Sequence, residues 1–177
     1  MPAIDQTAVQ GFMKIGLNAL TTTEQGRALE DLVCYVFGLV PGIALTHRNE
    51  LNVFDTEEID VALWNDAAPD GFPFLPSLIL VECKNWSQRV SSGEVAWFLT
   101  KLRNRGLDFG ILISPRGITG DSQDLTAAHS IVAGALAERR RLLVLTSDEL
   151  QALADTQNLA VLIKRKLCDL AVKGSIG

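Results

Sequence analysis

The chain has 177 residues, with 16 Lys and Arg against 21 Asp and Glu, so its formal net charge is −5 at pH 7. Its length and its 47% hydrophobic content predict one folded domain over residues 1–177 and exclude an intrinsically disordered chain. The acidic balance argues against a polycationic protein that binds nucleic acid without preference, because phosphate neutralisation supplies that affinity.

The cysteines and the N-terminus indicate the compartment. Cys34, Cys83 and Cys168 are far apart and odd in number, which predicts reduced thiols and not a disulfide or zinc framework. The N-terminus lacks the basic and apolar segments of a signal peptide, and no apolar run reaches the roughly 18 residues of a membrane span. We therefore expect a soluble cytoplasmic protein without a membrane partner.

Two helices are expected before the first strand. Apolar residues recur at three- and four-residue steps over residues 4–20, the pattern of an amphipathic helix. A second helix is predicted over residues 24–40, capped by Thr22 or Thr23, with Pro41 and Gly42 at its end.

The rest of the chain predicts a mixed sheet covered by helices. Three strands with short connections, an arrangement that favours antiparallel pairing, are expected at residues 43–50, 58–65 and 77–85. Two more strands are expected at 107–114 and 141–146, and helices at 92–106, 122–140, 147–154 and 158–172, with Asp121 opening the second of these helices. The alternation of strands and helices predicts the α/β class.

Three charged residues interrupt the apolar strands. Residues two apart on a strand share a face, so Glu82 and Lys84 project together while Cys83 points to the other layer. If the strands at 58–65 and 77–85 pair, Asp60 can lie across from Glu82. Two such carboxylates are suitable ligands for Mg²⁺, and a lysine beside them can orient or help to deprotonate a metal-bound water.

A second interpretation explains the same residues without a metal. Glu82 and Lys84 can be a neighbouring ion pair on a solvated sheet face, with Asp60 at an edge. A Glu-x-Lys triplet is common by chance, and spacing alone leaves both interpretations open. The Glu57–Glu58 pair likewise fits either a second ion site or a solvated strand start.

The order of these motifs resembles the PD-(D/E)xK nuclease superfamily. Asp60 and the triplet Glu82-x-Lys84 follow a helix that carries Glu30. The stretches "GRALEDLVCYVFGLV", "EIDVALWN", "LILVECKNW" and "EVAWFLTKLRNRGLDFGILISPRGIT" narrow the resemblance to Mrr-like restriction endonucleases, over about residues 26–119. The resemblance implies a restriction-endonuclease-like αβββαβ core at about 22–146, a mixed sheet flanked by helices, with an extra N-terminal helix and C-terminal helices.

The resemblance also implies roles for individual residues. Asp60 and Glu82 would bind Mg²⁺ or Mn²⁺, and Lys84 would position the attacking water. Glu30 would join the metal site directly or through water, although it equally fits a solvated helix face. Ile59 stands where many members have proline. Gln88 is the nearest counterpart of a glutamine or lysine that some members carry after the catalytic strand.

Basic residues after this strand are candidates for contacts with DNA phosphates. Arg89 and Lys101 are expected to bind substrate together with Gln88, and Arg116 is a further available contact. The "PRGITG" segment can present backbone N–H groups to an anion, although turn formation alone explains its glycines. His129 is expected to be a packed or half-exposed residue and not a catalytic base.

Together these observations predict a metal-dependent DNA endonuclease acting in restriction or defence against foreign DNA. A homodimer, or a protein partner that delivers DNA, would reconcile such a site with an acidic chain. The alternative is a catalytically inactive nuclease-fold module for nucleic-acid binding or protein interaction. An intact set of Asp60, Glu82 and Lys84 favours the enzyme, since a decayed module has no need of it.

Overall fold

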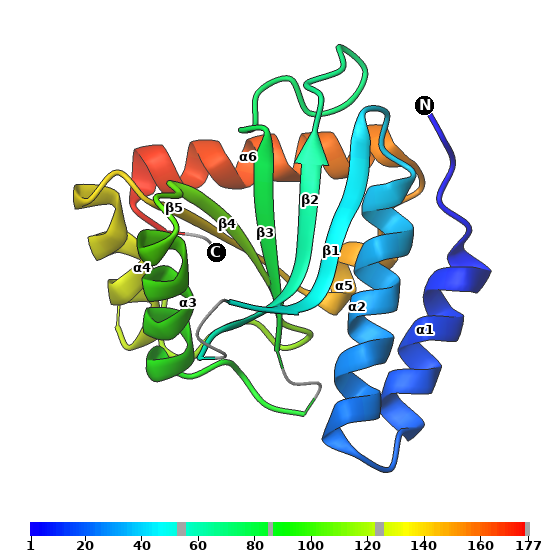
Figure 1. Ribbon diagram of the computed structural model, residues 1–177, viewed down its shortest axis with the longest axis horizontal. Helices are drawn as coiled ribbons and strands as arrows, with labels where there is room; N and C mark the ends of the chain where they lie inside the picture. The colour runs from blue at the N-terminus through cyan, green and yellow to red at the C-terminus, as the bar shows by residue number, and fades with distance from the viewer. Residues whose placement is uncertain (53–55, 85–86, 123–125, 176–177) are drawn as a thin grey trace.

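A mixed five-stranded sheet forms the centre of the protein (Figure 1). The structure, a computed structural model, describes residues 1–52, 56–84, 87–122 and 126–175. The strands follow chain order across the sheet: β1 (Ile43–Leu51), β2 (Glu58–Asn65), β3 (Leu78–Cys83), β4 (Phe109–Ile113) and β5 (Arg141–Leu145). The first three strands pair antiparallel, and β3, β4 and β5 pair parallel. The predicted mixed sheet and αβββαβ order are confirmed.

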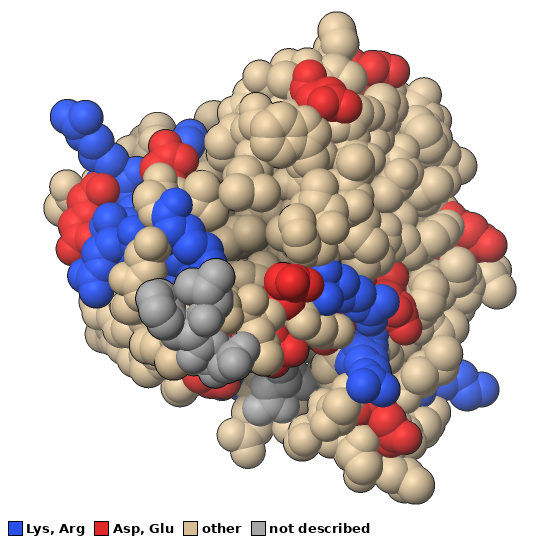
Figure 2. Space-filling view, viewed as in Figure 1, with Lys and Arg blue, Asp and Glu red and all other residues tan. Residues whose placement is uncertain are grey.

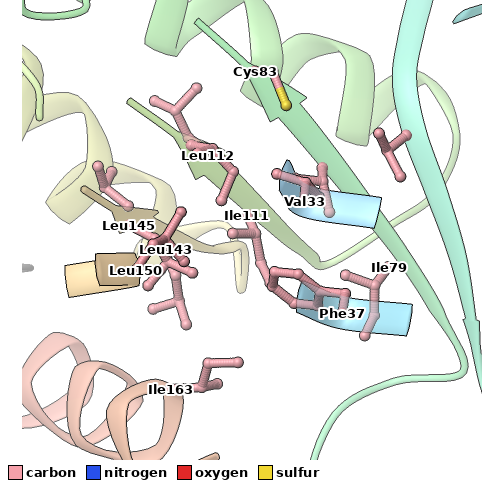
Figure 3. Packing of buried hydrophobic residues seen from close by; sticks show 14 of the residues in the cluster. Val33, Phe37, Ile79, Cys83, Ile111, Leu112, Leu143, Leu145, Leu150 and Ile163 are labelled. Carbon is pink, nitrogen blue, oxygen red and sulfur yellow. The ribbon is translucent and has the colours of Figure 1, made fainter. Parts of the chain in front are cut away.

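Helices cover both faces of the parallel part of the sheet. They are α1 (Gln6–Asn18), α2 (Thr22–Gly38), α3 (Ser92–Asn104), α4 (Ala128–Ala137), α5 (Ser147–Gln151) and α6 (Thr156–Lys173). Side chains of α2, α5 and α6 meet one face of β3, β4 and β5 in Figure 3. Helix α3 packs on the opposite face beside α4, and α1 packs against α2. Every residue of β4 is buried, as expected for a strand covered on both sides.

One glycine sets how closely α3 approaches the sheet. A Cβ at Gly110 would lie 2.8 Å from Leu102 and 3.0 Å from Phe98, so a side chain there would push α3 away from β4. Gly110 pairs with Leu80. Glu82 and Leu112, which also pair, lie two residues further along the same strands and so point to the same face. The close packing therefore brings α3 within reach of the end of β3 that carries Glu82.

The starts of α2 and α4 show why some helix starts differ from the predictions. Thr21, not Thr22 or Thr23, caps α2, and it forms a capping box with Glu24. The helix predicted from residue 122 begins at Ala128. Thr126 exchanges two hydrogen bonds with Asp121, and Ala127 has a φ of 47°, so the chain turns before α4. Residues 85 and 123–125 of the predicted elements lie outside the described residues.

The surface is uneven in charge. In Figure 2, Lys and Arg gather on the left of the view, where α3 and α4 lie in Figure 1, whereas the upper part over β1 and β2 is largely uncharged. An apolar hollow of about 400 Å³ on this part of the sheet includes the half-exposed Trp64 and Leu51. Of the helices in the described ranges, none has both the length and the apolar character needed to cross a membrane.

Candidate active site

Asp60 lies near the start of β2 and Glu82 near the end of β3, and these two strands pair with each other. The register pairs Val61 with Val81 and Ala62 with Leu80, and its continuation places Asp60 across from Glu82. The Asp60 carboxylate accepts a hydrogen bond of 2.6 Å from the backbone N–H of Cys83. That bond fixes the Asp60 carboxylate beside the strand that carries Glu82 and Lys84.

Glu82 is the most buried charge of the site, with 1% of its surface exposed, and two lysines bind it. The Lys84 Nζ atom lies 2.9 Å from Glu82 Oε1. Lys101 on α3 donates to both Glu82 oxygens, at 2.7 and 2.8 Å, and to the backbone carbonyl of Glu58 at 2.7 Å. A buried carboxylate needs such partners, because an unpaired charge in the interior is strongly destabilising.

The neighbouring charges of the site shift the pKa values of Asp60 and Lys84. Burial and the nearby negative charge of Glu82 raise the pKa of Asp60 to about 7, against the hydrogen bond from Cys83 and the attraction of both lysines. Burial alone would lower the pKa of Lys84, but attraction to Glu82 and Asp60 outweighs it and raises that pKa. Lys84 is therefore protonated at neutral pH in this arrangement.

Glu30 lies on the neighbouring helix α2 and has its own partners. Its Oε2 atom accepts hydrogen bonds from Arg48 Nε at 2.9 Å and from Asn49 Nδ2 at 3.0 Å, both on β1. Glu30, Asp60 and Glu82 all raise the pKa of the buried Cys83 thiol, although burial is the larger cause. All three carboxylates are thus within electrostatic reach of the Cys83 thiol, and Glu30 is buried, not solvated.

The two carboxylates of Asp60 and Glu82 suit an ion such as Mg²⁺ or Mn²⁺ that keeps several waters, and not an ion whose ligands all come from the protein. Mg²⁺ commonly binds through one or two carboxylates and keeps several waters. Within the described ranges, no group of three or more His, Cys, Asp or Glu side chains converges on a common point. Asp60 and Glu82 are the two carboxylates that could hold such an ion, with water and substrate oxygens completing its shell.

The predicted phosphate contacts divide into two groups. Gln88 and Arg89 are exposed and line a groove of about 770 Å³, together with Arg116 and the start of α5. We call this groove the trough. Lys101, expected to contact DNA from an outer surface, is only 4% exposed and binds Glu82 instead. The structure thus places Lys101 inside the carboxylate site and leaves Gln88 and Arg89 on its surface.

Two charged contacts of this region do not follow from the sequence analysis. Arg48 bridges Glu30 and Asp31 of α2, at 2.9 and 2.6 Å. Glu57, predicted as a solvated residue or an ion ligand, is buried and pairs with Arg105, and it accepts a hydrogen bond of 2.7 Å from Asn104. Glu57 therefore ties the start of β2 to the end of α3.

The sequence does contain a signal for Lys101. It follows the buried Phe98 by three residues and precedes the buried Leu102, so the helical period places it on the face of α3 that meets the sheet. A lysine at such a position is expected to have a buried acidic partner. For Arg48, on a strand with mostly exposed residues, no comparable pattern exists.

Comparison with known protein families supports the assignment of this region. A family model with the description "Restriction endonuclease", for the Mrr catalytic domain, matches residues 42–154. The matched segment contains all five strands together with Asp60, Glu82, Lys84 and Lys101, and it begins after Glu30. No curated protein matched the sequence.

Proposed function

Because the chain belongs to the Mrr-type restriction endonuclease family, whose model matches more than half of it, we propose that it is a metal-dependent DNA endonuclease hydrolysing phosphodiester bonds. The observation that supports this best is the convergence of Asp60, Glu82 and Lys84 at the ends of two paired strands. Burial of these charges is costly, and a purely structural role would be served as well by apolar residues.

Asp60 and Glu82 are the proposed ligands of Mg²⁺ or Mn²⁺. Such an ion, when bound, would stabilise the charge that develops on phosphate oxygens and lower the pKa of a bound water. The hydrogen bond from Cys83 holds the Asp60 side chain, and Lys101 holds that of Glu82, so both carboxylates are positioned before substrate arrives. Such preorganisation is a large part of electrostatic catalysis.

Lys84 is proposed to orient the attacking water and to stabilise negative charge. Its raised pKa means that its ammonium group carries a proton at neutral pH, so it donates hydrogen bonds and does not accept a proton in this state. About a third of its side chain is exposed, unlike that of Lys101, so substrate can reach it. Lys101 is then a positioning residue that acts through Glu82.

Glu30 is proposed to contribute through water. Its hydrogen bonds from Arg48 and Asn49 both use Oε2, which leaves Oε1 without a hydrogen-bond partner among the described residues. Arg48 fixes the Glu30 side chain by linking it to β1. A water between Glu30 Oε1 and the Asp60–Glu82 pair would extend the set of oxygen ligands.

The proposed substrate is DNA, and the proposed setting is restriction or defence against foreign DNA in the cytoplasm. A net charge of −5 gives little general attraction to phosphates, so affinity depends on the local basic residues Arg89 and Arg116 or on a second protein. A homodimer or a DNA-delivering partner would meet this need.

Cleavage of supercoiled plasmid tests the proposal. Wild type with Mg²⁺ or Mn²⁺ should nick or linearise the plasmid, EDTA should stop it, and Lys84→Ala should be inactive. Lys173→Ala is the matched control, because it removes an exposed lysine that makes only a surface ion pair with Asp169. Cleavage that persists in Lys84→Ala would contradict the proposed site.

One observation favours the alternative, a catalytically inactive nuclease-fold module. Both Glu82 oxygens are already bound by Lys101, and a metal would have to compete with that ammonium group. If this ion pair has replaced the metal, wild type would bind DNA equally with and without Mg²⁺ and would not cleave methylated or unmethylated plasmid. Metal-dependent cleavage would exclude the inactive module.

A further inference from the structure

A second cavity adjoins the trough on the side away from α1. Its volume is about 380 Å³, and its lining includes Arg89, Arg116, His129 and Lys166. The trough and this cavity share Arg89, Arg116 and Thr146, so the two arginines stand where the hollows meet. Both hollows lie beyond the carboxyl ends of the parallel strands, where α/β proteins commonly bind ligands.

Backbone hydrogen bonds hold the two arginine segments together. The Val90 N–H donates to the Gly117 carbonyl and the Thr119 N–H donates to the Val90 carbonyl, both at 2.9 Å. This parallel bridge fixes Arg89 beside the turn that carries Arg116. The same turn begins directly after β4, whose Ile113 carbonyl accepts the Lys84 N–H at 2.9 Å. The arginines are thus fixed relative to the proposed catalytic lysine.

His129 supplies an unsatisfied polar group in the wall of the cavity. It is 9% exposed, and its buried Nδ1 atom has no hydrogen-bond partner among the described residues. Burial lowers the pKa of His129 against the attraction of Asp121, and Arg89 lowers it further, so the imidazole is neutral at pH 7. A buried polar atom without a partner destabilises the folded protein, and a ligand able to hydrogen-bond with it would remove that cost.

The charges of the cavity favour an anion of charge −1. Lys166 and Glu149 form an ion pair of 2.8 Å and neutralise each other. Among the described lining residues, Asp121 offsets one of the two arginines, Arg89 and Arg116, which leaves a formal charge of +1. Neither arginine forms an ion pair within the described part of the chain. A phosphodiester carries one negative charge, and a terminal phosphate carries nearly two.

We propose that this cavity binds one backbone phosphodiester of the substrate DNA, held by Arg89, Arg116 and His129. The inference rests on the proposed function, since it describes how the substrate strand continues past Asp60 and Glu82. Arg89 and Arg116 bind the phosphate oxygens from the side of the trough, and the His129 imidazole donates a hydrogen bond from within. The trough accommodates the adjoining part of the strand.

The experiment measures DNA binding without catalysis. A fluorescein-labelled oligodeoxythymidylate is titrated with protein in EDTA, in the Lys84→Ala background, and its anisotropy is followed at several salt concentrations. The variants Arg116→Gln and His129→Phe are compared with Arg103→Gln, which removes an exposed arginine on α3 outside the cavity. Thermal melts confirm that each variant is folded.

Arg116→Gln should weaken binding about 5- to 30-fold and reduce the slope of log K against log salt by about one, as loss of one phosphate contact predicts. His129→Phe should weaken binding with little change in the slope, and Arg103→Gln should change neither. A single neutral methylphosphonate linkage at the bound position should weaken DNA binding by the Lys84→Ala parent protein. The same linkage should not weaken binding when Arg116→Gln is added to that parent. Equal affinity and equal slope for Arg116→Gln and its parent would overturn the proposal.

The two proposals fail separately. If wild type does not cleave plasmid but binding still depends on Arg116 and His129, the phosphodiester site stands and the endonuclease proposal is wrong. If wild type cleaves but binding is indifferent to both residues, the endonuclease stands and the phosphodiester site is wrong. A 5′-phosphorylated oligonucleotide that binds more tightly only when Arg116 is present would show that the cavity takes a terminal phosphate, which contradicts the diester assignment.

Discussion

The carboxylate site and the trough lie at the same end of the sheet, where β3 and β4 finish, but their charged residues differ in burial and in pairing. In the first, Asp60 and Glu82 face Lys84 and Lys101, and the formal charges cancel within a buried cluster. In the second, Arg89 and Arg116 are exposed and form no ion pairs with the residues that the structure describes. The charges of the first region are paired within the protein, whereas the two arginines have no ion-pair partner among the described residues.

This difference fits the roles that we propose for the two regions. Catalytic charges act most strongly where water is excluded, because electrostatic interactions weaken in a high dielectric. They are then stable only if each has a partner in the folded protein. Residues that bind phosphate have to exchange water for ligand, so leaving them exposed costs little stability and keeps them available. The two regions should therefore respond differently to mutation.

The largest effect is expected from Asp60→Asn on catalysis. The amide keeps the shape of Asp60 but removes the charge that would hold a metal, so the rate of plasmid cleavage should fall at least about 100-fold, the scale of losing one key electrostatic group. Its unfolding free energy should not fall, because burial and the charge of Glu82 raise the pKa of Asp60 to about 7, so the charged carboxylate opposes folding at neutral pH. Measured cleavage within a few-fold of wild type would remove Asp60 from the site.

Lys101→Met is expected to have the largest effect on stability. It leaves Glu82 buried with only Lys84 as a cation, and breaking a buried pair costs about 3–5 kcal/mol of unfolding free energy. Arg116→Gln should change that free energy by less than about 0.5 kcal/mol, because it alters an exposed residue. Urea denaturation of both variants tests the contrast between the two regions directly.

A second substitution sharpens this test. Adding Glu82→Gln to Lys101→Met removes the uncompensated charge, so the double variant should be more stable than Lys101→Met alone. If the two substitutions are simply additive, Lys101 and Glu82 are not energetically coupled, and the positioning role given to Lys101 fails.

A smaller effect is expected at Glu57, which links β2 to α3 near the carboxylate site. Hydrogen bonds from Arg105 and Asn104 lower the pKa of Glu57, so the stability it contributes is present above about pH 4.5 and is lost as the pH falls through the lowered folded-state pKa. Glu57→Gln should lower the unfolding free energy at pH 7 by about 1–2 kcal/mol and reduce its acid dependence. Denaturation at pH 7 and near pH 3 measures both.

The sequence predicts the strands and the shared face of Glu82 and Lys84, because both depend on local patterns. Strand β2 has the predicted bounds, and the period of two alone places Glu82 and Lys84 on one face. Contacts between distant segments are less accessible. The bond from Lys101 to Glu82 depends on how closely α3 approaches the sheet, which Gly110 controls. The late start of α4 depends on a turn closed by Asp121 and Thr126, which the Ala-rich composition hides.

Cys83 stands between Glu82 and Lys84 in the chain but points to the opposite layer, so its thiol can serve as a probe of local opening of the structure. Burial, and then the negative charges of Asp60, Glu30 and Glu82, raise the pKa of its thiol well above that of a free cysteine, so its thiolate form is scarce. Cys168 is exposed and should react with an alkylating reagent at once. The slow rate of Cys83 modification would therefore report how often the end of β3 that carries Cys83 separates from α2.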